Sequence, residues 1–123
     1  MAREFSAGIL TISDKGSQGK RVDESGKTVA SLLQEQGFSV VQTKIVPDER
    51  QQIAEILAEW VDKDGLALIL TSGGTGLSPR DVTPQAMKDV IDFEVPGMAE
   101  AMRAESLKKT PHAMISRAMA GVR

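Results

Sequence analysis

The chain has 123 residues, enough for one compact domain and too few for two ordinary ones. Its 41% hydrophobic content can supply a core, and its formal net charge of −2 argues against a nucleic-acid binder, which usually carries a basic patch. The lack of cysteine excludes disulfides and thiolate chemistry, and the single histidine excludes a multi-histidine metal site. No apolar run approaches the ~20 residues that cross a membrane, and no signal-peptide layout is seen, so we expect a cytoplasmic protein without a membrane partner.

The first strand is predicted at residues 7–12, which are apolar almost throughout. An uninterrupted apolar run of this length is typical of a strand covered on both faces, as in a parallel sheet. The polar residues 14–24 contain two glycines and predict a loop. A helix is predicted next, with Asp23 or Ser25 as its N-cap and Gly37 at its end.

A second strand is predicted at residues 38–46, which are rich in β-branched side chains and are followed by Pro47. Asp48 fits the N-cap of the next helix, with Gln51 three positions later as in a capping box. Within that helix the apolar residues fall at i, i+3, i+4, i+7 and i+8, the clearest amphipathic pattern in the chain. Trp60 belongs to this apolar stripe, so we interpret it as a core residue rather than a ligand contact.

A third apolar strand is predicted at residues 66–70, and only helices are predicted after it. Two of these helices are signalled by a threonine–proline pair, because threonine caps a helix and proline suits its first turn. In the helix between them, Met98, Ala101 and Met102 are expected to face inward. The three helices are predicted from Thr83-Pro84 to about residue 92, from Pro96-Gly97 onward, and from Thr110-Pro111 to Gly121.

The alternation of strands and helices predicts an α/β fold with three layers, in which a mostly parallel sheet carries helices on both faces. We expect residues 1–123 to form a single domain without an internal repeat or a linker. About fifty residues follow the third predicted strand without another strand, so one edge of the sheet would lie open. We therefore expect one or more C-terminal strands to be missing from the domain.

Polar residues follow each predicted strand. Ser13-Asp14 follows the first strand and Pro47-Asp48 the second. The third strand is followed by Thr71-Ser72-Gly73-Gly74-Thr75-Gly76, here called the glycine loop, and then by Arg80-Asp81. Because ligands of open parallel sheets bind beyond the carboxyl ends of the strands, we expect these residues to share one ligand-binding rim.

The composition of the glycine loop suits phosphate binding. Its glycines leave the main chain bare, so that N–H groups can approach a phosphate closely, and its hydroxyl groups add donors. The alternative is a tight turn after a buried strand, in which glycine serves only to allow a positive φ. The loop is neither a P-loop nor a G-x-G-x-x-G motif. Gly26-Lys27-Thr28 does not complete a P-loop either, because Arg21 stands where that motif needs glycine.

The three acids of the rim each have a second interpretation. Asp48 could be only a helix cap, Asp14 only a loop acid, and Asp81 a surface partner of Arg80. Interpreted functionally, two or three acids beside a phosphate loop suit Mg²⁺. This ion binds through one or two carboxylates together with ligand phosphate oxygens.

These residues resemble the molybdopterin-binding domain family and, within it, the MogA-type molybdopterin adenylyltransferases of molybdenum cofactor biosynthesis. The resemblance covers essentially the whole chain. The combination of the glycine loop with Arg-Asp-Val-Thr-Pro is highly specific for the superfamily and less specific for the adenylyltransferase within it. The matching segments are residues 11–14, 46–49, 70–76, 79–84, 95–103 and 106–117.

The resemblance implies a nucleotidyltransferase that moves AMP from Mg-ATP to the terminal phosphate of molybdopterin and releases pyrophosphate. It implies that Asp48 and Asp81 are the catalytic acids and hold Mg²⁺. It also implies a homotrimer and a partner enzyme that inserts metal into the adenylylated product. A MoaB-like paralogue, or a module that carries molybdopterin without this activity, are the alternatives. The implied ligand-binding residues are Ser13, Asp14, Thr71, Ser72, Gly73, Gly74, Thr75, Gly76 and Arg80.

The resemblance also bears on the end of the chain. The family normally continues past Gly121-Val122-Arg123 into another strand and a Leu-Pro-Gly-x-Pro loop that contributes to the pterin site. The absence of that segment agrees with the open sheet edge expected above. We therefore expect the domain to be C-terminally incomplete.

Overall fold

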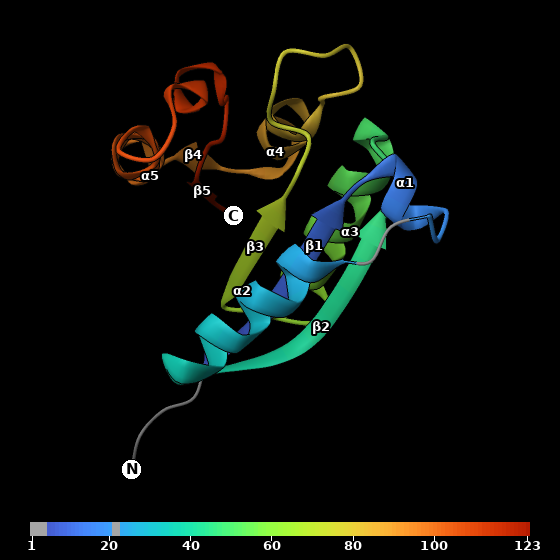
Figure 1. Ribbon diagram of the computed structural model, residues 1–123. Coiled ribbons are helices and arrows are strands. Elements are labelled where there is room, and N and C mark those ends of the chain that lie inside the picture. The colour runs from blue at the N-terminus through green and yellow to red at the C-terminus, as the bar shows by residue number, and fades with distance from the viewer. Residues whose placement is uncertain (1–4, 21–22) are drawn as a thin grey trace.

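The computed structural model describes residues 5–20 and 23–123 of the chain. Its centre is a three-stranded parallel sheet in the order β2-β1-β3 (Figure 1). The strands are β1 (Phe5–Ile12), β2 (Phe38–Val46) and β3 (Leu68–Ser72). The predicted parallel sheet is confirmed, although β3 begins two residues later than expected and takes in the first two residues of the glycine loop.

Helices cover both faces of this sheet. Helix α2 (Glu24–Glu35) lies on one face, and α3 (Arg50–Asp62) and α4 (Thr83–Val90) lie on the other (Figure 1). Because side chains of a strand alternate between faces, the mostly apolar β1 supplies both cores. The core under α2 contains Ala7, Ile9 and Leu33, and the larger core under α3 and α4 contains Leu10, Ile12, Val46, Ile53, Leu57, Trp60, Leu66, Ala86 and Val90.

Trp60 packs against the middle of β1, where Gly8 leaves room for it. A Cβ atom at Gly8 would lie 2.7 Å from Leu66 Cδ1 and 2.8 Å from Trp60 Cε3, so a larger residue would displace the indole. Trp60 is 5% exposed, which confirms its interpretation as a core residue.

The N-terminus of α2 is close to its predicted position. The Asp23 carboxylate accepts a hydrogen bond from Gly26 N at 2.9 Å, as an N-cap should, and a second from the Thr11 hydroxyl at 2.8 Å. Gly26 is buried in the first turn of α2, so it lies in a helix and not in a phosphate-binding loop. The prediction of a loop for residues 14–24 is wrong at its start. There, Ser13 caps the four-residue helix α1 (Asp14–Ser17) by accepting from Gly16 N.

The C-terminal region, residues 93–123, differs from the prediction. It contains β4 (Phe93–Glu94), α5 (Pro96–Leu107), the 3₁₀ helix η1 (Pro111–Ile115) and β5 (Gly121–Val122). Strands β4 and β5 pair antiparallel, so the predictions of helices only and of a helix ending at Gly121 are wrong. The pairing involves two residues on each strand, which is too short to produce an alternating apolar pattern.

The prediction that Met98, Ala101 and Met102 face inward is also wrong. Met98 and Met102 are 57% and 56% exposed, and Ala101 is exposed as well. The inner face of α5 is instead marked by Ala99 and Arg103, which lie four residues apart. Arg103 donates to the main-chain oxygen of Ala118 at 2.6 Å, so a polar contact decides which face of α5 turns inward.

Candidate functional site

Asp14 and Asp48 join the ends of β1 and β2 at the predicted rim. Asp14 N donates to the Asp48 carboxylate at 2.9 Å, and Asp48 N donates to the Asp14 carboxylate at 3.0 Å. The N-cap position of α3 belongs to Glu49 and has no side-chain hydrogen bond, so the prediction that Asp48 caps this helix with Gln51 is wrong. The Asp48 side chain instead binds Asp14, which follows the neighbouring strand β1.

Arg80 binds the same pair of strand ends from the far side of the glycine loop. Its Nε and Nη2 donate to the Asp14 carboxylate at 3.1 and 2.9 Å, and Nη2 also donates to Glu49 at 3.1 Å. Arg80 therefore pairs with Asp14. The alternative that Asp81 is a surface partner of Arg80 is wrong. More than half of the Arg80 side chain is exposed, so these ion pairs contribute position more than stability.

The two neighbouring acids differ in their protonation energetics. Hydrogen bonds from Arg80 and from Asp48 N hold the pKa of Asp14 below its usual value. Burial, and secondarily the nearby carboxylates of Asp14 and Asp81, raise the pKa of Asp48. Asp48 therefore carries a negative charge that its surroundings only partly balance, and a cation placed there would relieve it.

The glycine loop needs glycine at its first two glycine positions. Gly73 and Gly74 have φ values of +100° and +69°, which side-chain-bearing residues rarely adopt. A Cβ atom at Gly73 would also collide with the Ile12 carbonyl oxygen, and one at Gly74 with the Thr83 hydroxyl. Gly73 and Gly74 therefore adopt the positive φ values that the tight-turn interpretation requires. A binding role of the loop is compatible with this turn.

The carbonyl groups of residues 73–76 are all held by two other residues. Thr83 donates to the Gly73 oxygen through its hydroxyl at 2.8 Å and to the Gly74 oxygen through its N–H at 3.1 Å. Arg117 donates to the Thr75 oxygen through its main-chain N–H and to the Gly76 oxygen through Nε, both at 2.8 Å.

This arrangement turns four N–H groups away from the residues that hold the loop. No peptide bond of the described chain is cis, and in a trans peptide the N–H points opposite to the carbonyl of the same unit. The N–H groups of residues 74–77 donate no hydrogen bond within residues 5–20 and 23–123. Successive free N–H groups in a turn are the elements from which anion-binding concavities are built.

Asp81 lies where the chain returns from the glycine loop to α4. Its carboxylate accepts from Ser78 N at 3.0 Å, and its own N–H donates to the Ser78 oxygen at 2.9 Å. A Cβ atom at Gly76 would lie 2.8 Å from Asp81 Oδ2, so glycine there lets the carboxylate approach the loop.

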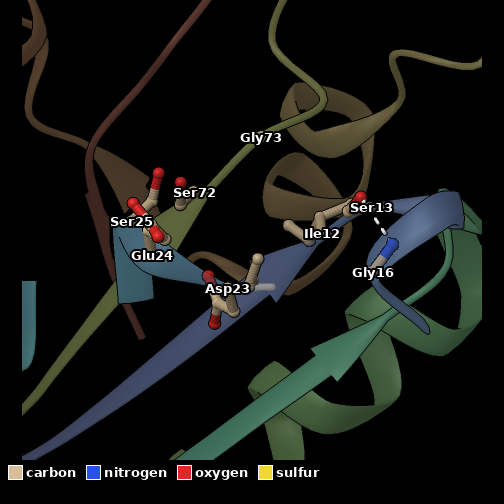
Figure 2. A pocket seen from close by; sticks show the side chains of 9 residues that line it. Ile12, Ser13, Gly16, Asp23, Glu24, Ser25, Ser72 and Gly73 are labelled. Atoms are coloured by element: carbon tan, nitrogen blue, oxygen red, sulfur yellow. Dashed lines mark hydrogen bonds between the residues drawn. The ribbon is translucent and has the colours of Figure 1, made fainter. Parts of the chain in front are cut away.

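A cavity of about 350 Å³ opens beside the loop, between the ends of β1 and β3, α1 and the N-terminus of α2 (Figure 2). Its size suits a small ligand. Of the predicted site residues, Ser13, Ser72 and Gly73 line it. Thr71 does not line it and pairs with Leu10 of β1 one residue before Ser72. The lining residues are Thr11, Ile12, Ser13, Gly16, Asp23, Glu24, Ser25, Ser72 and Gly73.

Sequence reasoning missed several residues of this site. The sequence predicts Asp23 or Ser25 only as a helix cap and predicts no role for Glu24. Thr83 was interpreted as a cap, yet its hydroxyl donates to Gly73, and the N-cap position of α4 has no side-chain hydrogen bond. The one signal for Thr83 is its place in the Arg-Asp-Val-Thr-Pro segment of the resemblance. Arg117 offered none, because its partners are main-chain carbonyls that every residue carries.

The acids of the rim can bind Mg²⁺ only together with ligand phosphate oxygens. Among the described residues no group of three or more acidic, histidine or cysteine side chains could hold a metal by itself. Both oxygens of Asp14 already accept hydrogen bonds, two of them from Arg80. Asp48 and Asp81 remain, and two carboxylates suffice when ligand phosphates complete the coordination.

The fold and the rim define the class of domain. It is an α/β domain with an open sheet, in which acids and a glycine loop lie together at one edge. The family model described as "probable molybdopterin binding domain" matches residues 8–122. The chain belongs to this family, which confirms the resemblance.

Related proteins agree with this membership. A Helicobacter pylori protein named molybdopterin adenylyltransferase is 41% identical over 118 residues, covering 94% of this chain and 67% of the relative. Gephyrin of Dictyostelium discoideum is 40% identical over 98% of this chain. The chain spans only 18% of gephyrin, so that protein's whole activity does not transfer by similarity.

Solved structures confirm the fold. The molybdopterin biosynthesis enzyme MoaB of Thermus thermophilus superposes with a TM-score of 0.90 and 50% sequence identity. The match covers 97% of this chain and 75% of the MoaB chain. The predicted MogA/MoaB-like α/β fold is therefore correct.

Proposed function

We propose that this chain is a molybdopterin adenylyltransferase of molybdenum cofactor biosynthesis, which transfers AMP from ATP to the molybdopterin phosphate. The observation that carries the proposal is the row of free N–H groups at residues 74–77 beside Asp48 and Asp81. The name of the H. pylori relative supports the same activity.

In the proposed reaction an oxygen of the molybdopterin phosphate bonds to the α-phosphorus of ATP. The bond from that phosphorus to the bridging oxygen breaks, and its electron pair leaves with pyrophosphate. A phosphate nucleophile is already ionised near neutral pH, so no side chain has to remove a proton. The protein therefore acts mainly by positioning the phosphates and by balancing their charge.

The rim divides these tasks among its residues. The N–H groups of residues 74–77 orient a phosphate, and the adjoining cavity receives the body of a ligand. Arg80 faces the same rim, and its Nη1 donates to no other residue in the described part of the chain. That donor can reach a phosphate oxygen while the rest of the guanidinium stays on Asp14.

Asp48 and Asp81 are the residues that would hold Mg²⁺ together with ligand phosphates. When bound there, Mg²⁺ supplies positive charge to the phosphate oxygens. The raised pKa of Asp48 supports this assignment, because it reports negative charge that a cation would relieve.

The resemblance extends the proposal to assembly and location. We propose a homotrimer in the cytoplasm, whose adenylylated product passes to a partner enzyme that inserts the metal. Among the described residues, no helix is long and apolar enough to span a membrane. Light scattering of the purified protein gives the mass of the assembly, and a monomer would contradict the trimer.

A MoaB-like paralogue that binds molybdopterin without this activity is the second candidate. The T. thermophilus MoaB structure, at 50% identity, is the observation behind it, although that structure is described only as a molybdopterin biosynthesis enzyme. Both candidates use the same loop and cavity, so binding alone does not separate them.

A single incubation separates the two candidates. The protein is mixed with molybdopterin, ATP and Mg²⁺, and mass spectrometry follows adenylyl-molybdopterin while a coupled assay follows pyrophosphate. The adenylyltransferase produces both in equal amounts, and omission of Mg²⁺ abolishes them. Bound molybdopterin without either product would contradict the adenylyltransferase and support the paralogue.

A further inference from the structure

Arg117 reaches the glycine loop from a distant part of the chain. It follows η1, far beyond the loop in the sequence, and is partly buried. Its main-chain N–H donates to the Thr75 oxygen and its Nε to the Gly76 oxygen, both at 2.8 Å. Its Nη2 donates to the main-chain carbonyl oxygen of Asp81 at 2.6 Å.

These three bonds fix the direction of three peptide units. The carbonyl groups of Thr75 and Gly76 point at Arg117, so the N–H groups of Gly76 and Leu77 point away from it. The third bond holds the main chain of Asp81, from which its carboxylate extends. The first half of the loop does not depend on Arg117, because Thr83 holds its carbonyls.

We propose that Arg117 is a positioning residue, which orients the Gly76 and Leu77 N–H groups toward a ligand phosphate and sets the place of Asp81. Its effect on turnover rests on the function proposed above. Its effect on the arrangement of the loop does not. Through Arg117 the C-terminal region takes part in the site without contacting the ligand.

Arginine suits this role better than lysine. Its planar guanidinium presents several donors in a fixed fork, so Nε and Nη2 can hold the Gly76 and Asp81 carbonyls at once. Lysine offers one point charge on a flexible stem. Arg103 steadies the segment, since it donates to the Ala118 oxygen next to Arg117.

The test compares Arg117→Ala and Arg117→Lys with the control Arg123→Ala. Arg123 matches Arg117 in chemistry, because it also forks to two partners, the Asp62 carboxylate and the Val90 carbonyl, at 2.7–3.1 Å. Those partners lie at the C-terminal ends of α3 and α4, away from the rim. Three measurements are made on each protein: the backbone amide NMR resonances of residues 74–77, molybdopterin affinity, and turnover with Mg-ATP.

Arg117→Ala is expected to move the Leu77 resonance most, because the side chain holds the Gly76 carbonyl of the same peptide unit. The Gly76 resonance should move less, because the main-chain N–H of residue 117 still holds the Thr75 carbonyl, and that of Gly74 should stay nearly unchanged. It should weaken molybdopterin binding about 10- to 100-fold, since it removes two charge-assisted hydrogen bonds from the loop and its return segment. Arg117→Lys should fall between Arg117→Ala and the native protein, and added methylguanidinium should restore part of the binding of Arg117→Ala. Arg123→Ala should lower thermal stability and change affinity less than about threefold.

An unchanged Leu77 resonance in both Arg117 variants would overturn the proposal, as would equal loss of affinity in Arg117→Ala and Arg123→Ala. A native protein that forms no adenylyl-molybdopterin would overturn the proposed function instead. The amide resonances need no ligand, so they decide the role of Arg117 in either case. If Arg117→Ala does not fold, Arg117→Lys carries the same comparison.

Discussion

The parallel-sheet region and the C-terminal region use similar apolar residues to opposite effect. In β1, the side chains of Ala7, Ile9, Leu10 and Ile12 are at most 3% exposed. In α5 and η1, Met98, Met102 and Met114 are all more than half exposed. The difference lies in the neighbours, because β1 has helices packed on both faces of the sheet, whereas α5 contacts mainly the short η1.

The C-terminal region is held by another kind of contact. Arg103, Arg117 and Arg123 each donate to main-chain carbonyl oxygens at 2.6–2.8 Å, and together they tie this region to itself, to the loop and to α4. One region is thus organised by apolar burial and the other by arginine–carbonyl hydrogen bonds. The comparison teaches that an apolar helical pattern locates a core only where a second surface exists to cover it.

The largest effect is expected at Asp81, where the two regions meet. Asp81→Asn should lower turnover about 100- to 1,000-fold while changing molybdopterin affinity less than about threefold. An amide loses the charge that balances Mg²⁺ and phosphate, but its oxygen can still accept from Ser78 N, so the turn persists. Steady-state kinetics and equilibrium binding measure the two quantities.

Asp89→Asn is the control, because Asp89 is another acid of the α4 segment and forms only a surface pair with Arg50. It should leave turnover unchanged. Equal losses of turnover and affinity in Asp81→Asn would point to a structural role for Asp81 and would remove it from the catalytic residues.

Core truncation should separate the two regions in stability. Ile53→Ala is expected to lower the free energy of unfolding by about 2–5 kcal/mol, because this side chain of α3 is fully buried and its removal leaves a cavity. Met98→Ala should change it by less than about 0.5 kcal/mol, because more than half of that side chain is exposed. Chemical denaturation of the isolated chain measures both, and similar losses would break the comparison.

The glycine loop allows a test of steric fit apart from backbone conformation. Gly74→Ala should lower the free energy of unfolding by about 2–3 kcal/mol, because a Cβ atom is strained at φ +69° and collides with the Thr83 hydroxyl. Gly19→Ala is the matched control, since Gly19 has φ +72° and nothing within 4 Å of the added atom. It should cost about 1 kcal/mol. Equal losses would show that the close approach to Thr83 is unimportant.

Local signals predicted most of the sheet region. A nearly continuous apolar run predicted β1, because a strand buried on both faces leaves no other pattern, and β-branched residues followed by Pro47 predicted β2. Gly37 predicted the end of α2, because glycine accepts a positive φ, here +90°. The place of the rim followed from the predicted parallel strands, whose carboxyl ends lie at one edge of the sheet. The resemblance supplied the ligand.

Contacts between distant residues could not be predicted in the same way. Asp48 matches a helix cap in sequence, yet its partner is Asp14, 34 residues earlier, and no local pattern distinguishes the two roles. The inward face of α5 was mispredicted because a partly buried arginine, not the methionines, marks it. The role of Arg117 depends on carbonyl groups, which have no sequence signature.

The smallest expected effect concerns the two acids that share hydrogen bonds at the rim. The pKa of Asp48 is raised in the folded state, so its ionised form lowers stability above that pKa, and the loss disappears below the unfolded value. Asp48→Asn should therefore raise the melting temperature slightly near about pH 7 and have no such effect near about pH 3. The asparagine oxygen can still accept from Asp14 N.

Asp14→Asn should behave in the opposite sense, because the pKa of Asp14 is lowered when the protein folds. Its ionised form adds stability above the unfolded pKa, and this stability is lost as the pH falls through the folded value. The variant should thus melt below the native protein near about pH 7 and match it in acid. Thermal unfolding at both pH values measures each variant. If both variants lowered the melting temperature at neutral pH, Asp48 would not carry the unbalanced charge that the magnesium assignment uses, and that assignment would fall with it.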